Sequence, residues 1–229
     1  MLALYVVSSE LENKEAVRHE VAAVTAGFPI VEFVSNILEA EAAVAVHRDV
    51  TDGSVILVAS GGTEAIINQI VFQTAKPALV WANPENNSLA AALEAYAALK
   101  ARFPLKIVYS SLDAGQAAAG LESFDHTAAA IASIDRGVVG CLGAPSPWLL
   151  TSHGVQSFRS FKTRVVSLKL DRLLERYDLV PAEAAERVVA ALRAKAAAVD
   201  SREQDLINSA RLYLAMKDLA EEHNLTALT

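Results

Sequence analysis

The sequence has few cysteines, few aromatic residues and no long apolar run, and each shortage excludes a class of protein. Its 229 residues include a single cysteine, Cys141, so no internal disulfide can form. Cys141 stands in an apolar run, where we expect a small buried residue of a protein from a reducing compartment. No apolar run approaches the roughly 18 residues of a membrane-spanning helix, and the N-terminal run lacks the basic flank of a signal peptide. The sequence therefore predicts a cytoplasmic protein with no membrane partner.

A cluster of basic residues is also missing. Lysine and arginine together number 20 against 27 acidic residues, which gives a net charge of −7. Because nucleic-acid-binding surfaces gather Lys and Arg on one face, this scattered distribution argues against a nucleic-acid partner. Aromatic residues make up only 6% of the chain, whereas alanine is abundant. Alanine lets helices lie close to a sheet, so the composition favours a helix-rich α/β protein.

Short apolar segments rich in β-branched residues alternate with longer helical segments. The predicted strands are 2–7, 30–34, 54–59, 78–82, 106–110, 137–142 and 164–168, and the helices between or after them are 12–26, 36–49, 63–74, 87–102, 114–135 and 169–177. This alternation is typical of βαβ units with parallel sheets. The strands are almost continuously apolar, which fits sheets covered on both faces. We therefore predict an α/β fold with two Rossmann-like (flavodoxin-like) parallel-sheet domains, each a three-layer α-β-α sandwich.

The C-terminal third is organised differently. Pro181 suits the first position of a helix over 181–199, and Asp200 or Ser201 can cap a further helix over 202–222. One face of that last helix is expected to carry Leu206, Ala210, Tyr213 and Lys217.

A domain boundary is expected near residue 134, because the strands after it are joined by different connections. This gives an N-terminal α/β domain over 1–134 and a middle α/β domain over 135–229. The strand-like run 224–229 stands at the end of the sequence, so we expect the middle domain to be truncated there.

The segment Gly61-Gly62-Thr63-Glu64 directly follows a predicted strand. In an open α/β sheet, ligands bind outside the carboxyl ends of the strands, and glycines there let the backbone approach a ligand. Thr63 can cap the next helix, whose free amides favour an anionic or hydroxyl-rich ligand. The alternative is a tight turn with a threonine cap and a glutamate matched to the helix dipole. The segment is neither a P-loop nor a dinucleotide fingerprint, because the required lysine and the G-x-G-x-x-G pattern are missing.

Two other strand ends carry polar or aromatic side chains. Asn83 and Asn87 either form turns and helix caps or present amides to the hydroxyl groups of a sugar. Ser146 and Trp148 lie in a proline-stiffened loop, where Ser146 is a cap or a ligand contact. Trp148 is either a platform for the apolar face of a sugar or a residue packed between domains. The predicted substrate-binding residues are Gly61, Gly62, Thr63, Glu64, Asn83, Asn87, Ser146 and Trp148.

Patterns for catalysis or metal binding are missing. Ser152 and His153 are adjacent, but no G-x-S-x-G elbow surrounds them. No histidine takes part in an H-E-x-x-H motif. We expect surface or helix-end positions for His19, His47, His126, His153 and His223. The sequence therefore predicts no catalytic residue and no metal site within this chain.

Four segments in this order resemble the N-terminal and middle domains of the L-fucose/L-arabinose isomerase superfamily, particularly its fucose-isomerase-like members. They are SVILVASGGTEAI, KPALVWANPENNSLAAALEA, GVVGCLGAPSPWLLTS and INSARLYLAMKDLAEEHNLTALT. The resemblance implies conversion of an aldose to a ketose with a divalent ion, usually Mn²⁺, held by two carboxylates and a histidine. In the family those groups follow the strand that 224–229 resembles, so they are missing from this sequence. The resemblance thus implies a sugar-binding homo-oligomer, a trimer or hexamer, whose chain is inactive alone.

Two other functions are compatible with the residues. A complete, non-catalytic module can hold a sugar or sugar phosphate between two α/β lobes, in a pocket formed by residues before and after about 135. A phosphotransferase or nucleotide binder would use Gly61 and Gly62, but no lysine beside them can grip a phosphate and no Asp cluster can hold magnesium.

Overall fold

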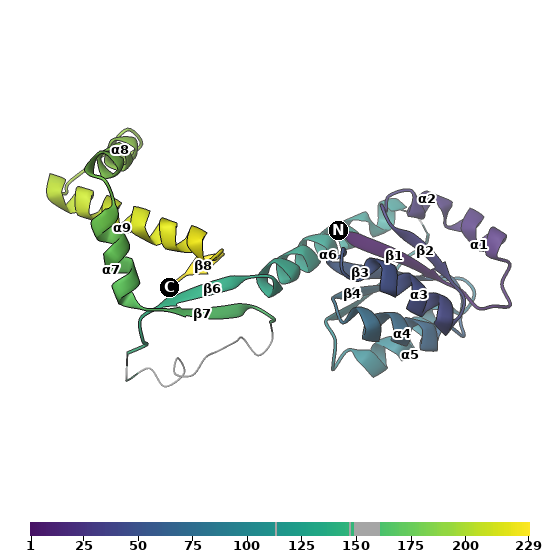
Figure 1. The fold of residues 1–229 in the computed structure, drawn as a ribbon. Coiled ribbons are helices and arrows are strands. Elements are labelled where there is room, and N and C mark those ends of the chain that lie inside the picture. The colour runs from purple at the N-terminus through teal and green to yellow at the C-terminus, as the bar shows by residue number, and fades with distance from the viewer. Residues whose placement is uncertain (113, 147, 149–160) are drawn as a thin grey trace. The chain divides into compact units, whose positions relative to one another are not determined.

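A computed structural model of the chain describes residues 1–112, 114–146, 148 and 161–229. The chain divides into two compact units, Met1–Ala132 and Ser133–Thr229. Each contains a parallel sheet with helices packed on it, so the predicted α/β fold class is confirmed (Figure 1). In the part of the chain that the structure describes, no helix is long and apolar enough to cross a membrane.

The first unit contains a five-stranded parallel sheet in the order β2-β1-β3-β4-β5. Its strands are β1 (Leu2–Val7), β2 (Val31–Val34), β3 (Gly53–Val58), β4 (Ala78–Ala82) and β5 (Leu105–Tyr109). The chain passes outward from β1 to β2 and then runs across the sheet in the opposite direction from β3 to β5. The neighbours β1 and β3 mark the reversal, and such a switch point leaves a crevice outside the carboxyl ends of the strands.

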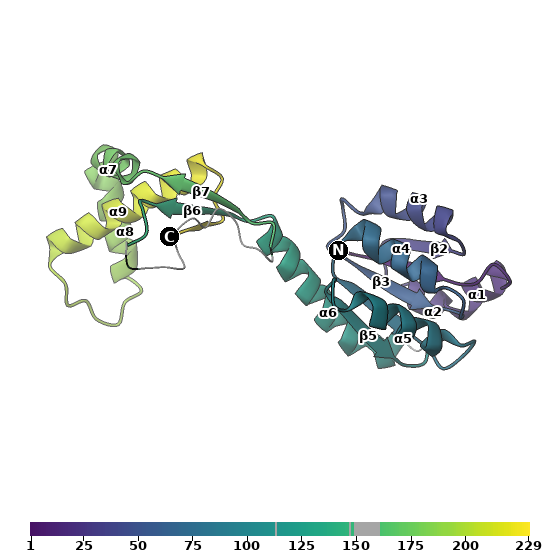
Figure 2. The same ribbon diagram turned by 90° about the horizontal axis from the view of Figure 1, so that it is seen from below.

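Helices cover both faces of this sheet (Figures 1 and 2). One face carries α3 (Ile37–His47), α4 (Glu64–Thr74) and α5 (Ser88–Leu99), and the other carries α1 (Lys14–Glu20), α2 (Ala22–Thr25) and α6 (Ala114–Asp135). Successive strand residues alternate between two cores, with Tyr5 and Ile56 towards α3–α5, and Leu4 and Leu57 towards α1, α2 and α6. Because both cores are apolar, the inner strands are apolar at almost every position, with Ser54 at the start of β3 as a buried polar exception.

The helix predicted over 12–26 is divided in two. The Asn13 side chain accepts hydrogen bonds from the amides of Glu15 and Ala16 and so caps α1. Val21 ends α1 with φ −94° and ψ 3°, outside the helical region, and α2 then forms a single short turn. Two short helices, α1 and α2, therefore pack on this part of the sheet in place of the single long helix predicted over 12–26.

The second unit contains a three-stranded parallel sheet in the order β7-β6-β8. Its elements are β6 (Val138–Leu142), β7 (Arg164–Leu168), α7 (Leu170–Leu179), α8 (Ala182–Arg193), α9 (Glu203–Glu222) and β8 (Ala227–Leu228). Leu173, Ala215 and Leu219 form its core together with Leu142. A Cβ atom at Gly140 would lie 2.4 Å from Cδ1 of Leu225, so a side chain in the middle of β6 would force the leucine side chains packed on it to move.

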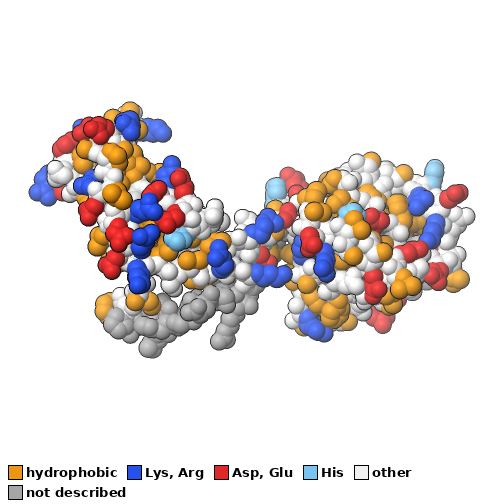
Figure 3. Space-filling view, viewed as in Figure 1, with side chains coloured by type: hydrophobic (Ala, Val, Ile, Leu, Met, Phe, Trp, Pro, Cys, Tyr) orange, Lys and Arg blue, Asp and Glu red, His pale blue; other side chains and the backbone are white. Residues whose placement is uncertain are grey.

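The outer surface of α7 and α9 carries interspersed acidic and basic side chains (Figure 3). Arg176 donates to Asp218 at 2.8 Å and to Glu222 at 2.6 Å. Arg172 also reaches Glu222, at 3.5 Å. Because these pairs are largely exposed to solvent, they add little stability.

Three details of the second unit differ from the sequence prediction. The helix predicted over 181–199 already ends at Arg193, and β8 is shorter than predicted. The residue that flanks α9 is Arg202 rather than Asp200 or Ser201, and its side chain makes no capping bond.

The predicted apolar face of α9 is wrong in part, because two helices pack against α9 from different sides. Ala210 contacts the α8 side, whereas Ala215 and Leu219 face α7, and Tyr213 and Lys217 are exposed. Cys141 is partly exposed rather than buried.

Candidate functional site

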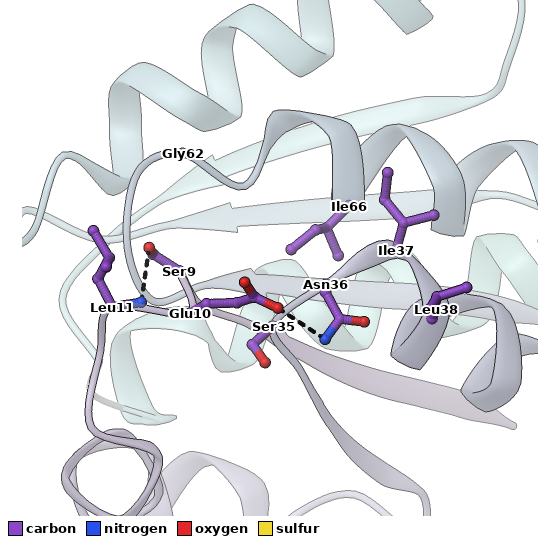
Figure 4. A pocket seen from close by; sticks show the side chains of 9 residues that line it. All are labelled: Ser9, Glu10, Leu11, Ser35, Asn36, Ile37, Leu38, Gly62 and Ile66. Carbon is purple, nitrogen blue, oxygen red and sulfur yellow. Dashed lines mark hydrogen bonds between the residues drawn. The ribbon is translucent and has the colours of Figure 1, made fainter.

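The carboxyl ends of β1, β2 and β3 surround an open cavity of about 620 Å³ (Figure 4). Three strand-to-helix connections and the helices that follow them supply its lining: Ser9, Glu10, Leu11, Ser35, Asn36, Ile37, Leu38, Gly62 and Ile66. This is the switch point of the sheet, where open α/β folds place their ligands. The cavity is therefore the candidate functional site of the first unit.

Gly61 and Gly62 meet different structural requirements at the end of β3. The Gly61 amide donates to the carbonyl of Asn86 at 2.7 Å, and a Cβ atom at Gly61 would lie 3.0 Å from Cβ of Asn87. Gly62 instead has a φ of +75°, and a Cβ atom there would meet nothing within 4 Å. Gly61 is thus required by a close neighbour and Gly62 by left-handed backbone. Only Gly62 lines the cavity.

Thr63 flanks α4, but its side chain does not cap the helix. Its hydroxyl donates to the carbonyl of Ser60 at 3.0 Å and is fully buried, so the predicted side-chain cap is wrong. Glu64 is half-buried in the first turn of α4, where a negative charge suits the helix dipole, and it does not line the cavity. Among the described residues, the first amides of α4 consequently have no side-chain cap.

Asn83 and Asn87 support the loop after β4 and lie outside the cavity lining. The Asn83 amide group donates to the carbonyl of Val58 at 2.8 Å and accepts from the Glu85 amide at 2.8 Å. With 1% of its surface exposed, Asn83 has no group that faces a ligand. Asn87 has a φ of +58°, and its side chain makes no capping bond. Both residues have a structural task here, which fits the turn-forming alternative.

Ser146 and Trp148 belong to the second unit, in the loop after β6. Trp148 is 76% exposed, and Ser146 is half-buried. The lining of the cavity in the first unit consists of other residues. Ser152 and His153 lie outside the described residues.

The sequence prediction missed the residues that make up most of the site. The Ser9 amide donates to the hydroxyl of Ser60 at 2.8 Å and ties the β1 loop to the β3 loop. The Asn36 side chain donates to Oε1 of Glu10 at 3.0 Å, as Figure 4 shows. The available signal was a polar segment after each of the first two strands, Ser8 to Glu10 and Ser35 to Asn36.

Glu39, in the first turn of α3, holds the loop after β2 in place. Its carboxylate accepts from the Ser35 amide at 2.8 Å and from the Ser35 hydroxyl at 3.0 Å, and Lys14 donates to it at 2.9 Å. The hydrogen bond from Lys14, followed by those from Ser35, lowers the pKa of Glu39 against the opposing effect of burial. Oδ1 of Asn36 accepts from the Glu39 amide at 2.9 Å, so Asn36 is the N-cap of α3, while the Glu39 carboxylate bonds the residue before the cap.

Hydrogen-bonding groups remain available to a ligand in the cavity. Oε1 of Glu10 is engaged by Asn36, which leaves Oε2 as an acceptor. The Ser9 hydroxyl accepts from the Leu11 amide at 3.2 Å and keeps its own proton to donate. Within the described residues, the amide of Gly62 has no acceptor.

The lining also has an apolar part and contains neither lysine nor arginine. Leu11 and Leu38 are strongly exposed, and Ile37 and Ile66 lie beside them. A mixture of directed polar groups and apolar surface is typical of sites for small organic ligands. The lack of a cation in the lining disfavours a phosphate.

Metal ligands do not converge in the described part of the chain. No group of three His, Cys, Asp or Glu side chains is placed to hold a metal ion there. Of the histidines, His47 is bound to Glu32, with 2.7 Å between Nε2 and Oε1. The described residues thus do not fit the divalent ion of the sugar isomerases.

Comparisons with known proteins do not assign the chain to a family. No protein-family model matches the sequence, and no curated protein matches it.

Proposed function

We propose that the chain binds a small neutral sugar in the cavity above β1, β2 and β3. The observation that carries this proposal is the lining itself, which combines hydrogen-bonding groups with apolar side chains and has no basic residue. A sugar presents hydroxyl groups on its edge and C–H groups on its faces, so it needs both kinds of surface. Anionic ligands would meet the carboxylate of Glu10 without a compensating cation.

Three groups have the chemistry to bind sugar hydroxyls. Oε2 of Glu10 can accept from a hydroxyl, and charge-assisted hydrogen bonds of this type are stronger than neutral ones. The Gly62 amide can donate to a hydroxyl oxygen, with further support from the positive end of α4. The Ser9 hydroxyl can donate as well. Ile37 and Leu38 would face the apolar side of the ring.

We further propose that the chain is the N-terminal and middle portion of an aldose–ketose isomerase-like protein. The α/β architecture and the four segments that resemble that superfamily support this assignment. Because no metal cluster is present among the described residues, the chain would supply substrate and oligomer contacts rather than the isomerisation chemistry. A divalent ion such as Mn²⁺ would belong to groups outside those residues.

A non-catalytic sugar-binding module is the second candidate. It would use the same cavity, and the lack of a described metal cluster is equally compatible with it. The two candidates differ in quaternary structure, since the isomerase-like protein is proposed to form trimers or hexamers and the module to remain monomeric.

Calorimetric titration of the chain with aldopentoses, 6-deoxyhexoses and their phosphates tests the proposed site. Glu10→Ala should weaken sugar binding about tenfold, since a hydrogen bond to a charged group contributes roughly 1.5–3 kcal/mol. Glu12→Ala is the matched control, because Glu12 is an exposed carboxylate of the same loop outside the cavity lining. Equal affinity of the two variants, or no binding of any sugar, would refute the site.

The catalytic assignment needs a separate measurement. The chain alone, incubated with Mn²⁺ and the same sugars, should form no ketose. Ketose formation would show that this chain itself carries the catalytic groups, and it would refute the assignment. Light scattering of the same sample distinguishes a trimer or hexamer from a monomeric binding module.

A further inference from the structure

Another cavity, of about 440 Å³, lies on the face of the five-stranded sheet that α1, α2 and α6 cover. Residues from β1, the α2 region, β4 and α6 line it: Met1, Leu2, Ala23, Val24, Gly27, Phe28, Pro29, Trp81, Ala118, Leu121, Glu122 and Asp125. It forms because α2 ends at Thr25, so the irregular segment 26–29 and α6 leave part of the sheet face uncovered.

The body of this cavity is apolar. Val24, Phe28 and Leu121 line it, and Trp81 is completely buried at its base. The indole N–H of Trp81 donates to the hydroxyl of Ser110 at 3.0 Å. Because Trp81 is completely buried, it packs beneath the cavity without facing a ligand. The partly exposed ring of Phe28 supplies the aromatic surface of the lining, which attracts both apolar groups and cations.

Two carboxylates stand at the rim. Glu122 and Asp125 are three residues apart on α6, so they lie on the same side of that helix. Neither makes an ion pair with any described residue. The cation in the lining is the ammonium group of Met1, which is held by Asp52 at 2.6 Å. The rim therefore carries negative charge that the described residues do not compensate.

We infer that this cavity binds a small organic cation with an apolar body, such as an arylalkyl amine. The apolar part would displace water from the hydrophobic lining, and the ammonium group would pair with Glu122 and Asp125. The volume lies in the range of roughly 300–1,000 Å³ that is typical of small-molecule sites. An anion with the same body would be repelled by the two carboxylates. This site is separate from the sugar cavity and does not depend on it.

Fluorescence of Trp81 provides a direct test. The chain has two tryptophans, so Trp148→Phe, at an exposed position, leaves Trp81 as the single emitter. In this background, 2-phenylethylamine should change the Trp81 emission in a saturable manner. 2-Phenylethanol, with the same body but no charge, should bind about tenfold more weakly, and phenylacetate should not bind.

Variants separate the charge contribution from the apolar one. Glu122→Gln combined with Asp125→Asn should reduce the affinity for 2-phenylethylamine to that for 2-phenylethanol. The affinity for 2-phenylethanol should not change. Glu94→Gln, an exposed charge removal on α5, is the control and should change neither affinity. Ala118→Phe should abolish the response to both ligands by filling the cavity, with circular dichroism confirming the fold.

Three outcomes would overturn the inference. They are a lack of saturation with the amine at millimolar concentration, equal affinities for amine and alcohol in the unaltered cavity, and an unchanged response in the Ala118→Phe variant. The last result would place the ligand elsewhere on the molecule.

Discussion

Substitution of the two adjacent glycines tests why each is needed at the end of β3. At Gly62, alanine meets no neighbour, but it must adopt a φ of +75°. For a non-glycine residue the left-handed conformation costs roughly 1–2 kcal/mol, and asparagine tolerates it better. At Gly61 the problem is steric, because the new Cβ atom would lie 3.0 Å from Cβ of Asn87. Overpacking of this kind costs roughly 1–3 kcal/mol and grows with side-chain size.

The two positions should therefore respond in opposite order to the same pair of substitutions. Gly62→Ala should lower the melting temperature of the first unit by about 3–6 °C, since each kcal/mol shifts a domain of this size by roughly 3 °C. Gly62→Asn should recover part of that loss. Gly61→Asn, in contrast, should be more destabilising than Gly61→Ala, because asparagine is larger.

Thermal and urea unfolding followed through Trp81, in the Trp148→Phe background, reports on the first unit separately from the second. The order of stabilities, rather than a single value, is the decisive measurement. If alanine and asparagine behave alike at Gly62, or if asparagine is the milder change at Gly61, the assignment of backbone strain to one glycine and steric contact to the other is wrong.

Three further substitutions test individual interactions. Burial, with a contribution from Glu32, raises the pKa of Tyr5 to about 12, and its buried hydroxyl has no hydrogen-bond partner among the described residues. Because the folded-state pKa is raised, the stability linked to it is complete below the unfolded pKa, near 10, and is lost as the pH rises towards 12. Tyr5→Phe should therefore be neutral or stabilising at pH 7 and should remove this alkaline loss of stability in urea titrations. The pKa of Glu39 is lowered mainly by the hydrogen bond from Lys14, so its carboxylate stabilises the fold above its unfolded pKa and loses that effect as the pH falls through the folded pKa. Lys14→Met should raise the Glu39 pKa in an NMR titration and reduce the loss of stability in acid. An unchanged Glu39 pKa would contradict the assigned cause. Gly140→Ala should destabilise the second unit by about 1–3 kcal/mol through contact with Leu225 and leave the unfolding of Trp81 unchanged.

The sequence was sufficient for the secondary structure of the first unit because its inner strands serve two cores. Residues such as Leu4 and Tyr5 face opposite helical layers, so each inner strand is almost entirely apolar and is easily distinguished from the helical segments around it. Local chemistry at the ends of elements was less predictable. Val21 interrupts the first helix, and Thr63 bonds to Ser60 rather than to the helix that it precedes.

The candidate site was predictable only in part, because its residues are distant in sequence. Gly62 could be found from the pattern after the third predicted strand. Ser9 and Asn36 become its neighbours only through the strand order, which places β1 between β2 and β3. Asn83 has the composition of a binding residue, but its burial and its bonds to Val58 and Glu85 depend on contacts between loops.

The carbonyl of Val58 has a consequence for the thermodynamics of ligand binding. It accepts from the Asn83 side chain at 2.8 Å and from the Ser88 hydroxyl at 2.5 Å, so two neighbouring loops are fastened together at the last residue of β3. A guest molecule that contacts Gly62 would meet a backbone that is already ordered. Little conformational entropy would then be lost from the protein on association, and weak polar contacts could give measurable affinity.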